Sequence, residues 1–279
     1  MKCKFCGDNN TILLRKIRST YNGKMYDFCS CNNCKNNFFN VELNDLKEMY
    51  DDLANNLILD DDFVKSSYWA NEVKSINKMC HNIKSILDVG CRTGDYLLHF
   101  GSDIERNGIE LSHRSASIAK KRGLNVYEDF IENIPFEGKK FDVVSCYAVL
   151  EHLESPIPVM ADLANLVNED GVLVVMIPFF NSFKSKLLYT FGLDWHMFSC
   201  PQHLNFFTKE FLDEFYKERG FKLQSVKYTS GGMFNPFRRI PIIRGIFGRV
   251  MNFLDFYTPL NKLPIFDHMY LYYKKSNVK

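Results

Sequence analysis

The chain changes near residue 83 from a polar, cysteine-rich opening to a regular alternation of apolar runs and amphipathic stretches. The apolar runs are typical of buried strands and lie at Ser85–Val89, Asn107–Leu111, Phe141–Tyr147, Val172–Ile177 and, near the end, Asp267–Lys275. Helical patterns lie between them, as at Ser115–Arg122 and Pro158–Val167. Strands that alternate with helices predict an α/β, Rossmann-like fold with a mostly parallel sheet covered on both faces.

This pattern divides the chain into three parts. Residues 1–42 form the cysteine-rich segment, residues 43–82 form a helical linker, and residues 83–279 form the α/β domain. We expect a helix of the linker to open at Tyr68–Trp69 and lead into the domain. Two insertions are expected within the domain, a lid at residues 178–210 and an amphipathic helical segment at residues 233–265.

Composition places the chain among globular proteins. Of its 279 residues 46% are hydrophobic and 24% charged, and the net charge is +2. No apolar run approaches the ~18 residues needed to cross a bilayer, and the opening residues do not resemble a secretory signal. We therefore expect a cytoplasmic protein. A charge this close to balance does not by itself favour a nucleic-acid partner.

Five of the nine cysteines lie within the first 34 residues, in an arrangement typical of a zinc site. Cys3 and Cys6 form one Cys-x-x-Cys pair, and Cys31 and Cys34 form a second. Two such pairs supply four thiolates with the spacing that a tetrahedral zinc ion needs, and the ion would stabilise this small polar segment. Cys29 is an alternative to Cys31. The other interpretation, redox-active or buried cysteines, fits the paired spacing less well.

The first strand of the domain ends in a glycine turn, Val89-Gly90-Cys91-Arg92-Thr93-Gly94, with Asp88 one residue before the end of the strand. The dinucleotide fingerprint Gly-x-Gly-x-x-Gly fails here, because Arg92 and Asp95 replace its later glycines. A carboxylate at such a turn suits a cationic ligand better than a pyrophosphate. Glu110, near the end of the next strand, can accept hydrogen bonds from a ribose diol. A nucleoside that carries a positive group fits both carboxylates.

Taken together, the ordered motifs over roughly residues 83–221 resemble a class I S-adenosylmethionine (SAM)-dependent methyltransferase. Within that class, the chain resembles the group of ubiquinone-pathway O-methyltransferases and zinc-bearing sugar methyltransferases. The resemblance implies that Asp88 and the glycines shape the methionine end, Glu110 binds the ribose, Leu111 and Phe130 flank adenine, and Asp129 holds its amino group. The residues expected to bind the cofactor are Asp88, Gly90, Cys91, Gly94, Glu110, Leu111, Asp129, Phe130 and Tyr147.

Arg92 is a departure from the family pattern, in which a glycine occupies this position of the loop. Its side chain could collide with the cofactor, turn outward, or pair with the methionine carboxylate. We expect cofactor binding to survive. If Arg92 fills the pocket, the domain does not bind the cofactor.

Glu151-His152 follows the strand that ends at Tyr147 and is the expected acid–base pair. The methyl donor is already electrophilic, so the enzyme has to align the acceptor and remove its proton, for which a histidine is suited near neutral pH. The alternative is that both residues only fix the loop. Within the lid, His203 belongs to a His-Leu-x-x-Phe element found in the resembling enzymes and is expected to face the substrate, and His196 is a weaker candidate.

The sequence therefore predicts a zinc-bearing methyltransferase that acts on an oxygen or carbon of a small molecule, sugar or glycan precursor. One alternative is an RNA methyltransferase whose basic cysteine-rich segment contacts phosphates, although pairing of that segment with the acidic stretch after it is favoured. The other alternative is a catalytically silent binding module. Residues 238–257 contain a basic amphipathic pattern that could touch the inner face of a membrane, although a helix that covers the active site or forms a dimer is favoured.

Overall fold

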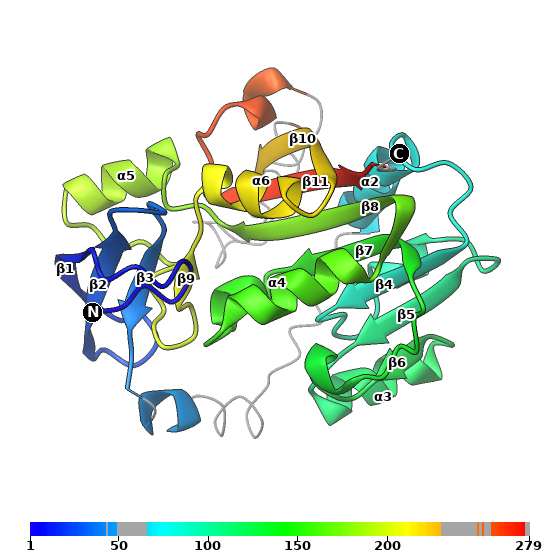
Figure 1. The fold of residues 1–279 in the computed structure, drawn as a ribbon, viewed down its shortest axis with the longest axis horizontal. Coiled ribbons are helices and arrows are strands. Elements are labelled where there is room, and N and C mark those ends of the chain that lie inside the picture. The colour runs from blue at the N-terminus through cyan, green and yellow to red at the C-terminus, as the bar shows by residue number, and fades with distance from the viewer. Residues whose placement is uncertain (43, 49–65, 230–249, 251–252, 254–257, 277–279) are drawn as a thin grey trace.

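A computed structural model describes residues 1–42, 44–48, 66–229, 250, 253 and 258–276. Two sheets organise this part of the chain (Figure 1). The elements in chain order are β1 (Thr11–Arg18), β2 (Met25–Cys31), β3 (Asn37–Asn40), α2 (Ser66–Asn77), β4 (Ser85–Val89), η2 (Leu97–His99), β5 (Glu105–Ile109), α3 (His113–Lys121), β6 (Asn125–Tyr127), η3 (Ile131–Asn133), β7 (Phe141–Tyr147), η4 (Leu150–His152), α4 (Pro156–Asn165), β8 (Val167–Pro178), α5 (Phe183–Thr190), β9 (Asn205–Phe206), α6 (Lys209–Lys217), β10 (Phe221–Thr229), η5 (Pro259–Lys262) and β11 (His268–Lys275).

The large sheet has seven strands in the order β10-β11-β8-β7-β4-β5-β6. All neighbours from β8 to β6 pair in parallel, whereas β11 runs antiparallel to both β8 and β10. The order reverses between β4 and β7, which is where open α/β sheets bind ligands at the carboxyl ends of their strands. The predicted α/β fold with a mostly parallel sheet is confirmed.

Alternating residues of the strands serve two hydrophobic cores, one on each face of this sheet. Along β8, Leu173 and Val175 join the core that contains α4 and α6, and Val174 joins the core that contains α2 and α3. Burial of alternate apolar side chains on both faces explains why the central strands are continuous hydrophobic runs. The layers α4/α6, sheet and α2/α3 fix the carboxyl edge of the sheet as a rigid platform.

The small sheet, in the order β1-β2-β3-β9, brings together two segments that lie far apart in the chain (Figure 1). Strands β1 to β3 come from the cysteine-rich segment, but β9 comes from the expected lid at residues 178–210 and pairs antiparallel with β3. Phe28, Phe39, Trp195 and Phe206 pack in one aromatic cluster between them. The cysteine-rich segment and the lid therefore share one core.

Several expected boundaries differ from those observed. The strand expected at Asn107–Leu111 is β5, Glu105–Ile109, so Leu111 lies beyond its end. Of the expected linker, residues 44–48 are helical and α2 begins at Ser66, just before Tyr68–Trp69. The expected amphipathic segment at residues 233–265 falls largely outside the described residues. Among the described helices, none is both long and apolar enough to cross a bilayer.

Candidate active site

The residues expected to bind the cofactor lie at or just after the carboxyl ends of β4, β5, β6 and β7. Gly90 follows β4, Glu110 follows β5, and Asp129 lies two residues beyond β6. Because these strands are parallel, their ends meet at one edge of the sheet. Motifs that are separated in the sequence therefore lie together in one site.

The turn after β4 requires conformations that favour glycine. Gly90 and Gly94 both have φ of +80°, and a Cβ on Gly94 would lie 2.0 Å from Leu124 Cδ1. Arg92 also has a positive φ, 50°, although it carries a side chain. That side chain is exposed, and its backbone N–H donates to Glu110 Oε2 at 2.9 Å. The position of the Arg92 side chain relative to the cofactor stays a prediction.

Two carboxylates, those of Asp88 and Glu110, neighbour this turn. Asp88 is buried and accepts a hydrogen bond of 2.6 Å from the Ser145 hydroxyl, and burial raises its pKa to about 7. Glu110 accepts backbone N–H bonds from Arg92 and, at 2.8 Å, from Ser112. Burial raises the pKa of Glu110, while these N–H groups and the Arg92 charge oppose the rise. These two hydrogen bonds hold the Glu110 carboxylate in one position beside the turn.

The expected adenine contacts lie at the outer end of this edge. Leu111 and Phe130 are 54% and 53% exposed, so their apolar surfaces are open to a ligand. Asp129 Oδ1 accepts hydrogen bonds from the Phe130 backbone at 2.7 Å and from Asn133 Nδ2 at 2.8 Å. The roles of Leu111, Asp129 and Phe130 in adenine binding stay predictions.

Cys91 is buried, and Tyr147 is half-buried among aromatic side chains. The Cys91 side chain lies so close to Gly108 that a Cβ there would meet its sulfur at 2.4 Å. Tyr147 donates a hydrogen bond of 3.1 Å to Glu72 and packs against Trp69 and Tyr96, with ring centroids 5.3 and 5.0 Å away. Cys91 thus faces the strand, and any contact of Cys91 with the cofactor would be through its backbone.

Sequence reasoning missed the aromatic cluster around Tyr147. Glu72 is buried in α2 and accepts hydrogen bonds from Tyr147 and Tyr272. The Tyr96 hydroxyl, also buried, has no hydrogen-bond partner among the described residues. The acidic position within the apolar face of α2 was the available signal for Glu72.

Glu151, His152 and His203 converge, although His203 lies far from the other two in the chain. Their ligand-forming atoms lie within 4.8 Å of one another, and the two imidazole centroids are 4.9 Å apart. His152 Nδ1 donates to the Gln202 carbonyl at 2.7 Å, and its Nε2 lies 4.0 Å from Glu151 Oε1. His203 Nδ1 donates to the Met197 carbonyl at 3.0 Å. The lid therefore brings His203 against the turn that carries the Glu-His pair.

Burial keeps all three groups in their neutral forms near pH 7. It raises the pKa of Glu151 to about 8, and Glu151 Oε2 has no hydrogen-bond partner among the described residues. Burial also lowers the pKa of His152, against the opposing effect of the Gln202 and Ala148 backbone groups. It lowers the pKa of His203 well below its usual value, and a proton on His152 would lower it further by repulsion. A neutral imidazole is the form that can accept a proton.

His196 lies in a second polar group that sequence reasoning did not assemble. The buried Asp267 accepts a hydrogen bond from Trp195 Nε1 at 2.9 Å and is paired with Lys184 at 2.7 Å. His196 Nδ1 and His268 Nδ1 lie 3.9 and 3.7 Å from its two oxygens. This group ties α5, the lid and the start of β11 together.

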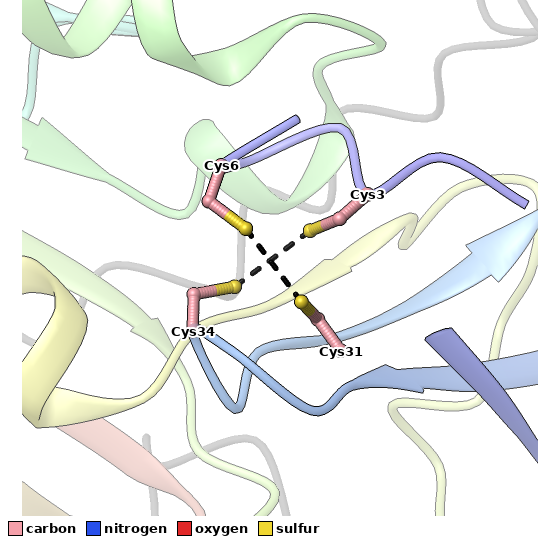
Figure 2. Close-up of side chains that lie close together, drawn as sticks. All are labelled: Cys3, Cys6, Cys31 and Cys34. Carbon is pink, nitrogen blue, oxygen red and sulfur yellow. Dashed lines mark hydrogen bonds between the residues drawn. The ribbon is translucent and has the colours of Figure 1, made fainter. Parts of the chain in front are cut away.

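The four expected metal ligands form one cluster, drawn in Figure 2. The Sγ atoms of Cys3 and Cys34 are 3.7 Å apart, and those of Cys6 and Cys31 are 3.6 Å apart. Tetrahedral zinc with Zn–S bonds of about 2.3 Å would place its sulfurs about 3.8 Å apart, so the donor set fits this ion. The Cys29 thiol instead approaches the Asp27 carbonyl at 3.8 Å, which selects Cys31 over Cys29.

A family profile described as "Methyltransferase domain" (Methyltransf_23) matches residues 63–226, more than half of the chain. The chain belongs to this methyltransferase family. The prediction of a class I SAM-dependent methyltransferase is therefore confirmed for family and fold. The matched range contains β4 to β8, all the expected cofactor residues and the Glu151-His152 pair.

Individual members of the methyltransferase family align over parts of the chain. A ubiquinone biosynthesis O-methyltransferase of Actinobacillus pleuropneumoniae is 28% identical over 144 residues, which cover 45% of this chain and 58% of that protein. A tRNA U34 carboxymethyltransferase of Nautilia profundicola is 29% identical over 103 residues, which cover 33% of each chain. The chain thus spans less than two thirds of the length of these relatives.

Solved structures show the same methyltransferase fold. The plantazolicin methyltransferase BpumL, in complex with a desmethylPZN analogue and SAH, has a TM-score of 0.53 and 17% identity, covering 83% of this chain and 89% of that chain. A SAM-dependent methyltransferase of Thermotoga maritima, described as a possible histamine N-methyltransferase, has a TM-score of 0.50 and 18% identity, covering 75% and 89%. At these identities the similarity concerns the fold.

Proposed function

We propose that the chain transfers the methyl group of SAM to an oxygen or carbon of a small-molecule acceptor, a sugar or a glycan precursor. The observation that carries this proposal is the cluster of Glu151, His152 and His203 at the same sheet edge as the expected cofactor residues. The cofactor half of the edge follows β4, β5 and β6. The acceptor half follows β7 and is covered by the lid.

The proposed step needs one base and little other covalent chemistry. His152 donates its Nδ1 proton to the Gln202 carbonyl, so the neutral ring has Nε2 as its proton acceptor. As the acceptor oxygen or carbon attacks the methyl carbon, its proton passes to His152 Nε2 and the carbon–sulfur bond breaks. SAM would supply the electrophilic methyl group and leave as a neutral thioether. The chain's main contribution is to hold the two reactants in line.

Zinc is proposed as a structural ion on Cys3, Cys6, Cys31 and Cys34. The burial of Cys3 and Cys31 and the spacing of the four sulfurs support this role.

The basic residues of the cysteine-rich segment support a small acceptor over RNA. Lys24 pairs with Asp45 at 2.7 Å, Lys16 lies 3.6 Å from Asp27, and Arg15 donates to the Tyr189 carbonyl at 2.9 Å. Phosphate groups would have to compete with these partners for the same charges. The cytoplasmic location stays a prediction. The membrane contact at residues 238–257 also stays a prediction, because only Val250 and Phe253 of this range are described.

The test is activity profiling of the zinc-loaded chain with methyl-labelled SAM against extracted metabolites and, separately, total RNA. We expect label in a small-molecule fraction, and a loss of about 100-fold or more in the His152→Ala variant, as is typical when a general base is removed. His81→Ala, which changes an exposed histidine, is the matched control. Label in RNA alone would support the RNA methyltransferase. Failure to bind SAM would support the silent module.

A further inference from the structure

Residues 203–208 lie between the cysteine-rich sheet and the Glu151-His152 turn, and they bond to both. The Leu204 amide donates to the Glu151 carbonyl at 2.7 Å, and its carbonyl accepts from the Phe39 amide at 3.0 Å. The next two residues form β9, in which Asn205 is paired with Phe38. One short segment therefore connects β3 to the expected acid–base pair.

Asn205 makes this connection through its side chain as well. It is fully buried, and its Nδ2 donates to the carbonyls of Leu150 at 2.8 Å and Leu153 at 2.7 Å. These two carbonyls bracket Glu151 and His152. Among side chains of this size, only the asparagine amide offers two protons from one atom to two carbonyls. Without those protons both buried carbonyls would lose their bonds, which is costly inside a protein.

The far end of the same segment is tied to the second cysteine pair. The Asn36 side-chain oxygen accepts the Thr208 amide at 2.7 Å and the Thr208 hydroxyl at 3.1 Å. The backbone carbonyl of Asn36 in turn accepts from the Cys31 amide at 3.0 Å. The position of the Cys31–Cys34 pair is thereby transmitted to Thr208 and along β9.

The residues expected to bind the cofactor are held by a separate set of hydrogen bonds. Asp88 is bonded to Ser145, and Glu110 to the Arg92 and Ser112 amides. All of these partners belong to the large sheet or to the turns that follow its strands.

We infer that Asn205 is a positioning residue through which the four-cysteine cluster holds Glu151 and His152 in place for the acceptor, while the cofactor half is held independently. The inference rests on the proposed function for the chemical role of these two residues. The coupling itself rests on the hydrogen bonds. Metal loading would then control the acceptor half of the site and leave SAM binding unchanged.

The test compares Asn205→Asp with Asn107→Asp in the zinc-loaded full chain. Aspartate keeps the shape of asparagine but has no N–H donors. Asn107 is equally buried and its Nδ2 also donates to two carbonyls, those of Ile86 and Glu105, but it lies in β5. The readouts are hydrogen exchange at the Leu204 and His152 amides and SAM affinity by calorimetry.

We expect Asn205→Asp to speed exchange at Leu204 and His152 by about 10-fold or more, as befits the loss of two buried hydrogen bonds, with SAM affinity unchanged within about 2-fold. Asn107→Asp should leave these two amides at their wild-type rates. Once profiling has provided an acceptor, Asn205→Asp should lower kcat while KM for SAM stays constant. Unchanged exchange and kcat in a folded Asn205→Asp protein would overturn the inference.

Zinc removal from the wild-type chain with a chelator tests the same coupling if Asn205→Asp does not fold. We expect the Phe39, Leu204 and His152 amides to lose protection together, and SAM still to bind. Loss of protection confined to β1, β2 and β3, with Leu204 and His152 still protected, would contradict the inference. If the wild-type protein instead failed to bind SAM at all, the proposed function would fall while the exchange data still decided the coupling.

Discussion

Glu110 shows how a single side chain can be prepared for a ligand. Two backbone N–H groups, from Arg92 and Ser112, hold its carboxylate in one orientation at the end of β5. Arg92 makes its bond through the backbone, so the amide can serve this purpose whatever side chain the residue carries. The departure from the family's glycine is therefore compatible with the site.

We expect Glu110→Gln to weaken SAM binding by about 10-fold or more, since hydrogen bonds to a charged group contribute about 1.5–3 kcal/mol. Glu105→Gln is the matched control, because Glu105 is an exposed carboxylate at the opposite end of the same strand, paired with Lys139. Calorimetric titration measures both. Equal affinities for the two variants would remove Glu110 from the ribose site.

Glu151 predicts a pH dependence of the stability of the free protein. Burial raises its pKa from 4.5 to about 8, so the folded state binds its proton more tightly than the unfolded state does. Stability should therefore be highest below about pH 4.5 for this group and should fall as the pH rises from there to about 8. Glu151→Gln should flatten this part of the profile and raise the midpoint of thermal unfolding at pH 8.

The control for this prediction is Glu154→Gln, which changes an exposed carboxylate in the same loop. Thermal unfolding of the three proteins between pH 5 and 8 provides the measurement. If Glu151→Gln and the wild type lost stability in parallel over this range, the buried carboxyl would not be the group responsible.

At the scale of elements, two glycines can be compared that share a left-handed backbone conformation but differ in the space available for a side chain. Gly94 and Gly123 have nearly the same φ, +80° and +81°, but a Cβ on Gly94 would meet Leu124 at 2.0 Å and one on Gly123 would meet no atom within 4 Å. Both alanine variants carry the cost of a left-handed residue, about 1–2 kcal/mol. Gly94→Ala should cost about 1–3 kcal/mol more, because it overpacks a core. Urea unfolding gives the difference, and equal losses would contradict the tight packing at the turn.

The sequence predicted the elements whose residues follow a single local pattern of apolar positions. The bounds of β4 and β7 agree with the apolar runs because these strands are buried on both faces by helices. The run at β5 was placed two residues late, since Asn107 and Gly108 interrupt it and Glu105 and Arg106 are polar. Strand β10 was not predicted because its solvent-facing residues break the apolar run. Spacing predicted the metal ligands with Cys29 as an alternative to Cys31, and the structure clusters Cys31 with the other three.

Long-range contacts could not be predicted from the same patterns. Strand β9 has two residues, and its partner β3 belongs to the opposite part of the chain. The convergence of His203 with Glu151 and His152 depends on that pairing. Only the family resemblance pointed to His203, and nothing in the sequence indicated that the cysteine-rich segment would support it.

At the scale of the whole molecule, the cysteine-rich segment and the lid share one aromatic core. Trp195 of the lid is fully buried in the aromatic cluster that also contains Phe28 and Phe39. We expect zinc removal to open this cluster and shift Trp195 emission to longer wavelength, because the ion contributes folding energy to the small sheet.

The chain has two tryptophans, so Trp69→Phe isolates the signal of Trp195 and Trp195→Phe isolates that of Trp69. Trp69 packs beside Tyr96 and Tyr147 on the large sheet, and its emission should not change on metal removal. Equal shifts in both single-tryptophan proteins would indicate global unfolding. No shift in either would show that the small sheet does not need the metal.

The most direct test of the account is a crystal structure of the zinc-loaded chain saturated with SAH. We predict the adenine between Leu111 and Phe130, the ribose hydroxyls on the Glu110 carboxylate, and the thioether directed toward Glu151 and His152, with Arg92 turned outward. A saturated crystal with no adenosyl density at this edge, or with the Arg92 side chain in its place, would contradict the account.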